Sequence, residues 1–295
     1  MNNREILSNF TLKHEKMNNQ TQSVLTLSAI QAAIFAGRKI LEIYNTGFTT
    51  SYKADQSPLT TADLAANEII VNRLLESGFP ILSEEGKNTD YQERREWHYF
   101  WLIDPLDGTK EFINHNGEFT VNIALVAGNT PAIGVIYVPV TGDLYFGNPE
   151  AGSYSATIAD TIDPNGFRAL EEVIASAQRL PLTQSDQKVT ILASRSHMSA
   201  ETEEIIEKIK TLYPDPEIIN AGSSLKFCRL AEGKAQIYPR FGPTMEWDTA
   251  AGHAIAANAG IKVLSWNERQ PLEYNKEDLV NPWFIAFNQI FNEFV

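Results

Sequence analysis

Cysteine and positive charge are both scarce in this sequence. Its 295 residues include one cysteine, Cys228, so an intramolecular disulfide and a cysteine metal cluster are excluded. The apolar surroundings of Cys228, LKFCRLAEG, favour a small buried residue over a nucleophile. Lysine and arginine total 24 against 37 aspartate and glutamate residues, which gives a formal net charge of −13. Such a chain repels nucleic-acid polymers and anionic lipid, and a small polyanion needs local cations or metal ions in order to bind.

Long apolar runs and clustered histidines are also missing. No continuous apolar run approaches the roughly 20 residues that span a bilayer, and we expect no transmembrane segment. Residues 1–22 lack the apolar centre of a secretory signal; we expect a polar, flexible extension, within which Met17 is an alternative start. The five histidines have no zinc-binding spacing, and we expect His98, His115 and His253 to be surface or packing residues.

Hydrophobic periodicity predicts two kinds of organisation along the chain. The first half reads as helices followed by antiparallel strands, and the second half alternates strand and helix. We therefore predict an α+β unit over residues 23–160, joined to an α/β unit over residues 161–295. Residues 23–44 have the spacing of a long amphipathic helix. A half-buried strand is predicted by the alternation of Phe119, Val121, Ile123 and Leu125.

The stretch WLIDPLDGTKEFI places two carboxylates, Asp104 and Asp107, directly after an apolar strand. Taken alone, the pattern Asp-Pro-x-Asp-Gly is good turn chemistry. Because Pro105 has no N–H, we expect the strand ladder to stop there. The turn would then aim both carboxylates and the Leu106 carbonyl at neighbouring points.

The residues that follow suit a phosphate ligand. Gly108 allows the backbone to approach a ligand closely, and Thr109 supplies a hydroxyl group. The next residues, KEFI, can begin a helix whose N–H groups face an anion. A phospho-aspartate mechanism is not predicted, because haloacid-dehalogenase-type phosphatases space their aspartates two apart, and here the spacing is three.

Further acids recur where strands end or helices begin, and such places commonly form sites. Glu84 and Glu85 follow the strand predicted at residues 80–82, and Asp63 and Asp248 lie near helix starts. Oxygen ligands without histidine or thiolate partners suit hard cations, above all Mg²⁺. Asp63 and Asp248 also fit a simpler role as helix-capping or first-turn acids, and Glu85 could only orient its neighbours or face solvent.

Three motifs in this order, SEE, DPLDGT and WDTAAG, resemble those of the inositol monophosphatase superfamily of Mg²⁺-dependent, lithium-sensitive phosphatases. Within it, DGTKEFI, ASRSH, GSSLKFC, GKAQIYPRFGPT and EWDTAAGHAIAANAG are similar to the CysQ-type 3'(2'),5'-bisphosphate nucleotidases. The resemblance begins near residue 23, and Ser83 stands where the family usually has glycine. It implies a layered α-β-α-β-α sugar-phosphatase fold, a mixture of α+β and α/β organisation.

The resemblance also implies roles for the acids, with two or three Mg²⁺ ions in each site. Glu84, Asp104 and the Leu106 carbonyl would hold the first ion, and Asp104, Asp107 and Asp248 would hold the second. Asp63 and Thr109 would pair and activate the attacking water. Gly108 and Thr109 would bind the scissile phosphate through backbone N–H groups. We therefore expect Asp63 and Thr109 to be catalytic.

For the rest of the substrate, the resemblance implies a set of polar side chains around the nucleoside and its second phosphate. A phosphate that stays in place needs cations other than the metal ions, and lysine or arginine can supply them. Lys226 alone would more simply be a solvated charge on a helix. The expected set is Arg195, Ser196, His197, Ser223, Lys226 and Arg240, beside the metal-site residues Glu84, Leu106, Asp107, Gly108, Thr109 and Asp248.

The resulting hypothesis is a metal-dependent phosphomonoesterase. Adenosine 3',5'-bisphosphate (PAP), a nucleotide of sulfur metabolism, would give AMP and phosphate, and PAPS is a second candidate substrate. Inositol monophosphatase or fructose-1,6-bisphosphatase activity is the nearest alternative, and a metal-binding regulator without turnover is another. The single cysteine fits a reducing cytosol, and we expect a cytoplasmic monomer or homodimer. The resemblance adds peripheral attachment to the cytoplasmic face of the inner membrane as a further option.

Overall fold

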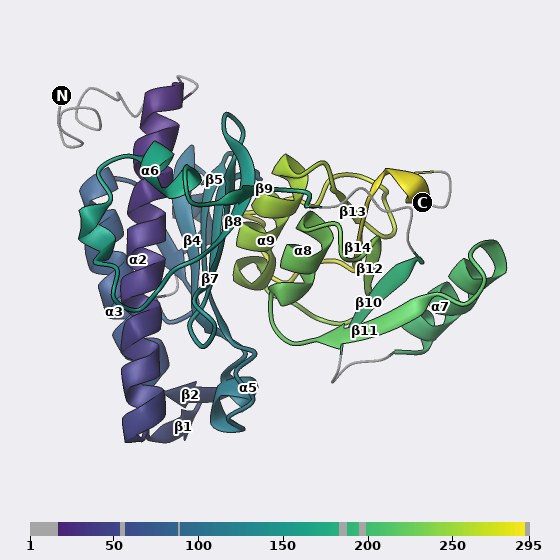
Figure 1. Cartoon of the computed structure of the whole chain (residues 1–295), viewed down its shortest axis with the longest axis horizontal. Helices are drawn as coiled ribbons and strands as arrows, with labels where there is room; N and C mark the ends of the chain where they lie inside the picture. The colour runs from purple at the N-terminus through teal and green to yellow at the C-terminus, as the bar shows by residue number, and fades with distance from the viewer. Residues whose placement is uncertain (1–16, 54–56, 88, 183–187, 195–198, 293–295) are drawn as a thin grey trace.

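The computed structural model describes residues 17–53, 57–87, 89–182, 188–194 and 199–292. Its helices and strands form five layers in the order α-β-α-β-α (Figure 1), as predicted. The three helical layers are α2 (Asn19–Thr46) with α3 (Thr61–Leu74), α8 (Leu225–Ala231) with α9 (Glu246–Asn258), and α7 (Ala200–Leu212). Between them lie a seven-stranded and a five-stranded sheet.

The larger sheet is a meander with one parallel strand at its edge. Its order along the sheet follows the chain, and every pair is antiparallel except β3 with β4. Strands β6 and β7 form an antiparallel hairpin around residue 140, in line with the antiparallel strands predicted for the first half. The strands are β3 (Ile81–Ser83), β4 (Tyr99–Asp107), β5 (Thr120–Ala127), β6 (Thr130–Val138), β7 (Asp143–Asn148), β8 (Gly152–Thr157) and β9 (Gln178–Arg179).

Strand β5 is buried on both faces, so the prediction of a half-buried strand was wrong. Val121, Ile123 and Leu125 pack in the core beneath α2 and α3, as their alternation indicated. The intervening Ala124 and Val126 pack in a second core with residues of α8 and α9. The helical layer between the two sheets therefore covers a face that the alternation alone would leave to solvent.

The smaller sheet is formed by the second half of the chain and contains both parallel and antiparallel strand pairs. Strand β10 pairs in parallel with β11 and β12, and β14 lies antiparallel between β12 and β13. Its bounds are β10 (Thr190–Ser194), β11 (Glu217–Ala221), β12 (Ile237–Arg240), β13 (Lys262–Ser265) and β14 (Phe284–Phe287). The sequence reasoning did not anticipate β14, because a four-residue apolar run has no periodicity long enough to identify a strand.

Helix α2 starts at Asn19, four residues before the predicted start, because the Asn18 side chain accepts a hydrogen bond from the Thr21 N–H at 2.9 Å and caps the helix. By length and composition α2 could cross a bilayer, but 67% of its most apolar window is buried inside the fold. The division of the chain into units at residues 22 and 160 stays a prediction.

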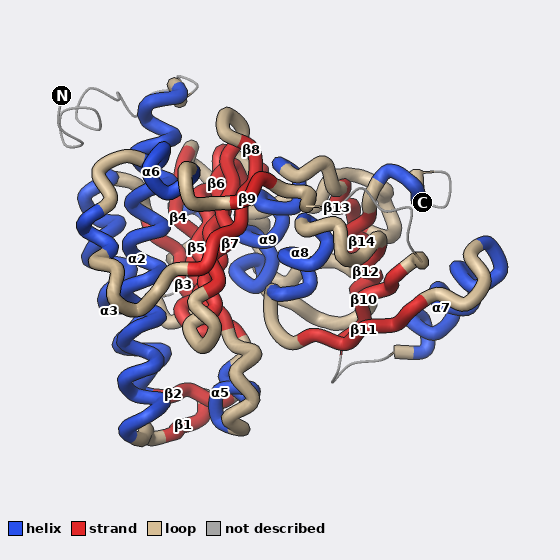
Figure 2. Tube along the Cα trace, viewed as in Figure 1, coloured by secondary structure: helices blue, strands red, loops and turns tan. Residues whose placement is uncertain are grey.

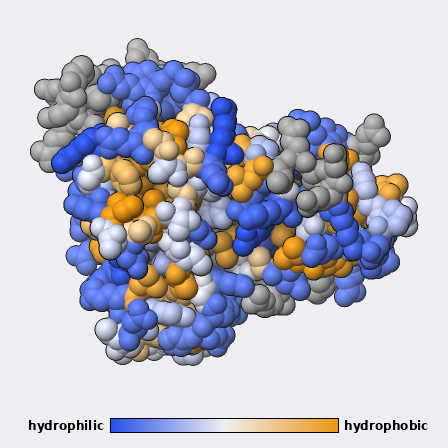
Figure 3. Space-filling model, in the orientation of Figure 1, coloured by the Kyte–Doolittle hydropathy of each residue, from blue (hydrophilic) through white to orange (hydrophobic). Residues whose placement is uncertain are grey.

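The remaining described elements are short and lie at the edges of these layers (Figure 2). They are β1 (Thr50–Tyr52), β2 (Pro58–Thr60), α4 (Tyr91–Arg94), α5 (Thr109–Ile113) and α6 (Leu170–Ile174), with 3-10 turns at Leu75–Ser77, Pro164–Gly166 and Gln289–Phe291. On the face shown in Figure 3, hydrophilic residues predominate and apolar ones lie between them in smaller groups.

Candidate active site

The C-terminal end of β4 carries a β-bulge that turns two acids toward the site. Asp104 pairs with Asn122 of β5, and Asp107 pairs with Thr120, so two residues of β4 face one residue of β5. The ladder therefore continues past Pro105 instead of stopping there, which corrects the sequence prediction. A bulge accommodates the missing N–H of Pro105 and bends the strand locally.

Both acids of this bulge are held by neighbouring donors. The Asp104 side chain is 1% exposed, and its Oδ1 accepts a hydrogen bond from the Leu106 N–H at 3.1 Å. Asp107 Oδ2 accepts from the Asn122 side-chain amide at 3.3 Å. Asp107 also accepts a backbone hydrogen bond from Ser224. These donors fix the carboxylates while leaving oxygen lone pairs for a ligand.

Gly108 makes the turn from β4 into α5 possible. Its φ of 92° lies in the left-handed region that favours glycine. A Cβ at this position would lie 3.2 Å from the Glu118 carbonyl oxygen, so space as well as conformation restricts the residue. Gly108 and Thr109 occupy the N-cap and first position of α5, where backbone N–H groups have no partner inside the helix.

Asp63 is both a helix-capping residue and a partner of Thr109. It is the third residue of α3, and its Oδ2 accepts hydrogen bonds from the N–H (2.8 Å) and the hydroxyl of Thr60, the N-cap residue. Its Oδ1 accepts from the Thr109 hydroxyl at 3.3 Å. The capping alternative and the pairing expected from the resemblance are therefore compatible, because they use different oxygens.

Asp248 has a similar position at the start of α9. It is the third residue of that helix, and its Oδ2 accepts a hydrogen bond from the N–H of Met245, the N-cap residue, at 2.8 Å. Asp248 is therefore not the N-cap itself, although it does stabilise the helix start. Its Oδ1 accepts no hydrogen bond from the described residues, and Asp248 lines a pocket.

Glu84 and Glu85 share a cation that the sequence reasoning missed. The Lys53 ammonium lies 2.7 Å from Glu84 Oε1 and 2.6 Å from Glu85 Oε1. Burial opposes the charge on Lys53, but the two glutamates outweigh it and raise its pKa. Glu85 is thus an ion-pair partner in this structure rather than a solvent-facing acid.

The acids of the site perturb one another. Burial raises the pKa of Asp104 well above its usual range, and repulsion from Glu84, Asp107 and Asp248 adds to the effect. The pKa of Asp248 rises to about 8, through burial and then repulsion from Asp107. The pKa of Asp107 rises only to about 6, because Lys226 opposes the effect of burial. Asp63 also has a raised pKa, mainly through burial.

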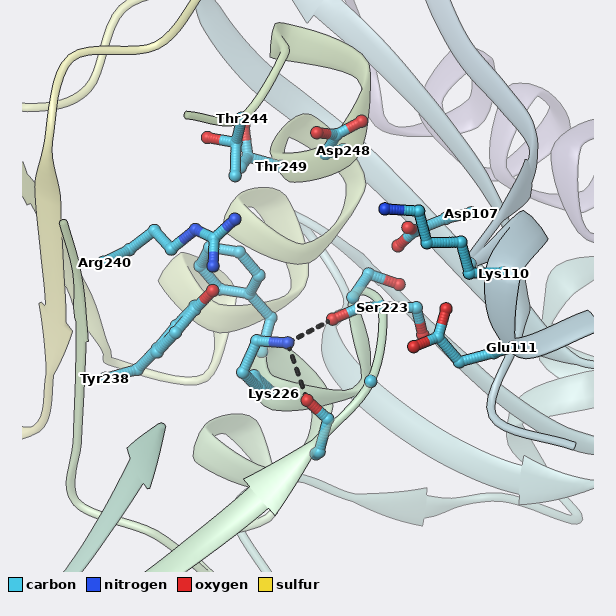
Figure 4. Close-up of a pocket in the computed structure, with 15 residues that line it drawn as sticks. Asp107, Lys110, Glu111, Ser223, Lys226, Tyr238, Arg240, Thr244, Asp248 and Thr249 are labelled. Atoms are coloured by element: carbon cyan, nitrogen blue, oxygen red, sulfur yellow. Dashed lines mark hydrogen bonds between the residues drawn. The ribbon is translucent and has the colours of Figure 1, made fainter. Parts of the chain in front are cut away.

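A pocket of about 180 Å³ lies between these acids and two cations (Figure 4). Asp107 and Asp248 border it from β4 and α9, while Lys226 and Arg240 point into it from α8 and β12. Its lining is Asp107, Gly108, Lys110, Glu111, Ala221, Gly222, Ser223, Ser224, Lys226, Phe227, Tyr238, Arg240, Thr244, Asp248 and Thr249. The pocket thus places negative and positive groups on facing walls.

Lys226 is not the solvated charge that its sequence context also allowed. It is 6% exposed, and its ammonium donates hydrogen bonds to the Ala221 and Ser223 carbonyl oxygens at 3.0 Å and 2.8 Å (Figure 4). Burial lowers its pKa to about 8 although Asp107 works in the opposite direction. Lys226 also lies 5.5 Å from the centre of the Tyr238 ring.

Two polar atoms at this pocket have no partner among the described residues. They are Ser223 Oγ and Arg240 Nε, both buried. Ser223 has a φ of 42°, which is unusual for a residue other than glycine. The other end of Arg240 is tethered, since its Nη2 donates to the Pro243 carbonyl oxygen at 2.9 Å. A ligand that accepts hydrogen bonds would satisfy both atoms.

The structure brings most of the predicted residues into one region. Six line the pocket: Asp107, Gly108, Ser223, Lys226, Arg240 and Asp248. Five others lie outside its lining, namely Asp63, Glu84, Asp104, Leu106 and Thr109. Asp104 interacts electrostatically with Asp63 and Glu84 and with the lining acids Asp107 and Asp248, while Leu106 and Thr109 donate hydrogen bonds to Asp104 and Asp63. Arg195, Ser196 and His197 lie outside the described residues.

Sequence reasoning also missed Asn122 and several pocket-lining side chains. Asn122 is 1% exposed and holds Asp107, and its position as a polar residue within the apolar run VNIALV was an available signal. Lys53 had no such signal, because its polar loop sequence, SYKADQSP, gives no indication of a partner 31 residues away.

The donor set fits a hard divalent cation. The pKa values of the buried Asp104 and Asp248 are raised because nearby positive charge does not offset burial and repulsion, and oxygen is the ligand atom that Mg²⁺ prefers. Within the described ranges no group of three His, Cys, Asp or Glu side chains forms a ready-made metal cluster. The pairing of Glu84 with Lys53 gives one physical reason, because that carboxylate is already engaged.

Comparisons with known proteins agree with this geometry. The sequence profile of the inositol monophosphatase family matches residues 21–289. The 3'(2'),5'-bisphosphate nucleotidase CysQ of Shigella flexneri is 43% identical over 259 residues, covering 86% of this chain and 96% of that protein. Its counterpart in Escherichia coli strain K12 is 42% identical over the same length, with the same coverage of both proteins.

A solved structure is similar over most of its length. The crystal structure of CysQ from Bacteroides thetaiotaomicron, a bacterial member of the inositol monophosphatase family, has a TM-score of 0.84 and 49% sequence identity. The alignment covers 93% of this chain and 99% of that one. With a family profile matched from α2 to the last described strand, the chain belongs to the inositol monophosphatase family.

Proposed function

We propose that the protein is a divalent-metal-dependent 3'(2'),5'-bisphosphate nucleotidase. Its preferred reaction would be hydrolysis of the 3'-phosphate of adenosine 3',5'-bisphosphate to AMP and phosphate. The names of the similar proteins support this substrate class, and the pocket supports it independently. One observation carries the proposal: a single pocket is lined by two acids, Asp107 and Asp248, and by two cations, Lys226 and Arg240.

Membership of the family implies a divalent metal ion, typically Mg²⁺. Glu84, Asp104, Asp107, Asp248 and the Leu106 carbonyl would hold two or three such ions. Bound there, Mg²⁺ would supply positive charge that polarises the phosphate and lowers the pKa of water. Glu84 would have to exchange its contact with Lys53 for the metal.

The Asp63–Thr109 pair would orient the attacking water and take up its proton. Thr109 donates to Asp63 Oδ1 in this structure, so its hydroxyl oxygen remains able to accept a hydrogen bond from water. Water oxygen would attack phosphorus in line while the bond from phosphorus to the 3'-oxygen breaks. The electron pair goes to that oxygen, which a second water protonates, and no covalent enzyme intermediate forms.

The phosphate that remains on the nucleotide would bind the cationic wall. Lys226 and Arg240 offer charge-assisted hydrogen bonds, and the unpartnered Ser223 hydroxyl offers another. Gly108 and Thr109 would bind the scissile phosphate through their N–H groups. The nucleoside would lie between the two walls. Arg195, Ser196 and His197 remain candidates for its contacts on the resemblance alone.

The test is phosphate release from adenosine 3',5'-bisphosphate, inositol 1-phosphate and fructose 1,6-bisphosphate at equal Mg²⁺. A kcat/KM at least about tenfold higher for the nucleotide, equivalent to about 1.4 kcal/mol, is expected. Preference for either sugar phosphate would replace the proposal by that activity, and no turnover of any would favour a metal-binding regulator. PAPS belongs in the panel because it differs from PAP at its 5' end, away from the acids.

We further propose a cytoplasmic enzyme that acts on a small nucleotide without a nucleic-acid polymer as partner. The net charge of −13 disfavours contact with anionic lipid and with nucleic acid. Whether the protein is a monomer or a homodimer stays a prediction to be tested by sedimentation.

A further inference from the structure

Helix α9 begins without an effective cap of its own. Its N-cap residue is Met245, whose thioether is a much weaker hydrogen-bond acceptor than the side chain of serine, threonine or aspartate. Asp248 Oδ2 accepts a hydrogen bond from the Met245 N–H, so the proposed metal ligand also stabilises the first turn of the helix. Something outside the helix must therefore hold this turn in place if Asp248 is to keep its direction.

The residue that does so is Glu246, the first residue of α9. Its side chain is fully buried, and its two oxygens accept hydrogen bonds from the N–H groups of Asn275 (2.6 Å) and Lys276 (3.0 Å). The Lys276 ammonium adds an ion pair at 2.6 Å. Asn275 has a φ of 63°. The successive N–H groups of Asn275 and Lys276 donate to one carboxylate, as in backbone anion-binding nests.

Arg94, the last residue of α4, also binds residues 275–277. Arg94 is 3% exposed, and its guanidinium donates to the Asn275 side-chain oxygen and to the Lys276 and Glu277 carbonyl oxygens, at 3.1, 2.7 and 2.9 Å. In return, the Asn275 side-chain amide donates to the Arg94 carbonyl oxygen at 2.7 Å. Two buried opposite charges therefore hold residues 275–277 between them.

This arrangement connects two parts of the metal site that are far apart in sequence. Arg94 lies in the segment that leaves β3 after Glu84, and Glu246 lies two residues before Asp248. The backbone adds two more links to the start of α9, from the Glu246 N–H to the Leu279 carbonyl oxygen and from the Asn281 N–H to the Thr244 carbonyl oxygen. Residues 275–277, which bind both Glu246 and Arg94, thus form a brace between the two sides, and the backbone links at Leu279 and Asn281 extend it to the start of α9.

We propose that Glu246 is a positioning residue that holds Asp248 in the direction needed for metal binding, through the brace that residues 275–277 form with Arg94. The inference rests on the proposed function, because it takes Asp248 to be a metal ligand. It assigns no contact between Glu246 and substrate or metal. Mutating a residue that orients a metal ligand typically lowers metal affinity by about 10- to 100-fold.

The experiment measures Mg²⁺ affinity without substrate, by isothermal titration, for the full-length protein and its variants. Glu246→Gln keeps the size of the side chain, but its amide NH₂ would face a backbone N–H or the Lys276 ammonium, both of which are donors. We expect the affinity for Mg²⁺ to fall by about 10- to 100-fold. At saturating Mg²⁺, kcat should recover to near the parent value, since no catalytic group is lost. Glu277→Gln, an exposed neighbour with the same charge change, should leave affinity within about twofold.

Two further variants separate the possible failures. Asp248→Asn is the reference: if it leaves Mg²⁺ affinity unchanged, the proposed metal ligand is wrong, whatever Glu246 does. If Asp248→Asn weakens binding but Glu246→Gln only lowers the melting temperature, the positioning role is overturned. Should Glu246→Gln not fold, Lys276→Met, which removes the ammonium that pairs with Glu246 and also its hydrogen bond to the Glu273 carbonyl oxygen, should still weaken Mg²⁺ binding. Unchanged binding in Lys276→Met would then contradict the proposal.

Arg94→Lys tests the brace as a unit. Lysine keeps the charge, but its compact ammonium cannot replace the planar fork through which Arg94 Nη1 and Nη2 bind acceptors on three successive residues. Because Arg94 and Glu246 act through the same segment, the double variant should lose no more Mg²⁺ affinity than the weaker-binding single variant. Losses that simply multiply would mean independent effects and would overturn the brace.

Discussion

The Thr109 hydroxyl donates to Asp63 Oδ1 at 3.3 Å, while the other oxygen of the same carboxylate holds the N–H of Thr60 at the start of α3. Asp63 thus divides its two oxygens between helix capping and the candidate site. The division explains how an acid can be fixed by the fold and still be available to a water molecule. It also means that a change at Asp63 has two separable effects.

Asp63→Asn should lower kcat by about 10²- to 10⁴-fold, the usual contribution of a general base. Mg²⁺ affinity should stay mostly intact, because the proposed role of Asp63 is to act on water. Initial rates across a Mg²⁺ titration separate the two parameters. A collapse of Mg²⁺ affinity with an unchanged rate at saturation would reverse the assignment.

Thr60→Ala is the matched control for capping. It removes the Thr60 hydroxyl from Asp63 Oδ2 without touching the Thr109 contact. We expect a stability loss of about 0.5–2 kcal/mol and a kcat close to that of the parent. If Thr60→Ala lost as much activity as Asp63→Asn, the effect of Asp63 would be structural.

Asp104→Asn should abolish activity while the fold persists. Asp104 is buried, and burial and four neighbouring acids raise its pKa, so a neutral amide relieves repulsion in the metal-free protein. The same change removes a proposed bridging ligand, and we expect activity to fall by more than about 100-fold, the upper range for residues that only orient ligands. Circular dichroism and thermal melting would show a folded variant, and near-normal turnover would contradict the metal assignment.

The metal-free protein should lose stability as pH rises. The usual aspartate pKa is about 3.9, whereas in the fold it is about 8 for Asp248 and about 6 for Asp107. Between these values the folded state holds protons that the unfolded state has released, so the free energy of unfolding falls with pH. Mg²⁺ should compensate by binding only the folded protein, by about 2.7 kcal/mol at 100 times its Kd.

Melting temperatures in EDTA and in Mg²⁺, taken from pH 5 to pH 8, check this expectation. The gap between the two conditions should widen toward pH 8, where protons no longer compete with the metal. Asp248→Asn should flatten the pH dependence in EDTA. An equal gap at every pH would show that the acids do not control stability in the way their surroundings indicate.

The acids could be predicted from sequence because each lies in a short motif at the end of a strand or the start of a helix. The contacts that fix them could not, since they join distant residues: Lys53 to Glu84, Asn122 to Asp107, and Glu246 to Asn275. The fold shows the same division. The helices with clear periodicity were predicted, whereas β14 and the bulge at Pro105 depend on strands that pair across the chain.

Lys226 is the sharpest test of substrate choice. Removing a charged hydrogen bond to phosphate costs about 1.5–3 kcal/mol, or about ten- to a hundredfold. Lys226→Ala should raise KM for adenosine 3',5'-bisphosphate by that factor and leave adenosine 3'-monophosphate, which lacks the second phosphate, little affected. The structure adds a complication, because the Lys226 ammonium also holds the Ala221 and Ser223 carbonyl groups.

Lys226→Met keeps the buried apolar stem and loses only the ammonium, so it excludes the effect of an emptied cavity, while the comparison of the two substrates addresses the freed carbonyl groups. Both variants free the two carbonyl groups, so any damage to residues 221–223 should weaken both substrates equally, and only lost recognition should separate them. Lys262→Ala, at an exposed position on β13, removes the same charge far from the pocket residues and should change neither KM. If both substrates suffered equally, Lys226 would be structural. If neither suffered, the second phosphate would have to bind elsewhere, and Arg240→Ala would be the next variant to measure against the same pair of substrates.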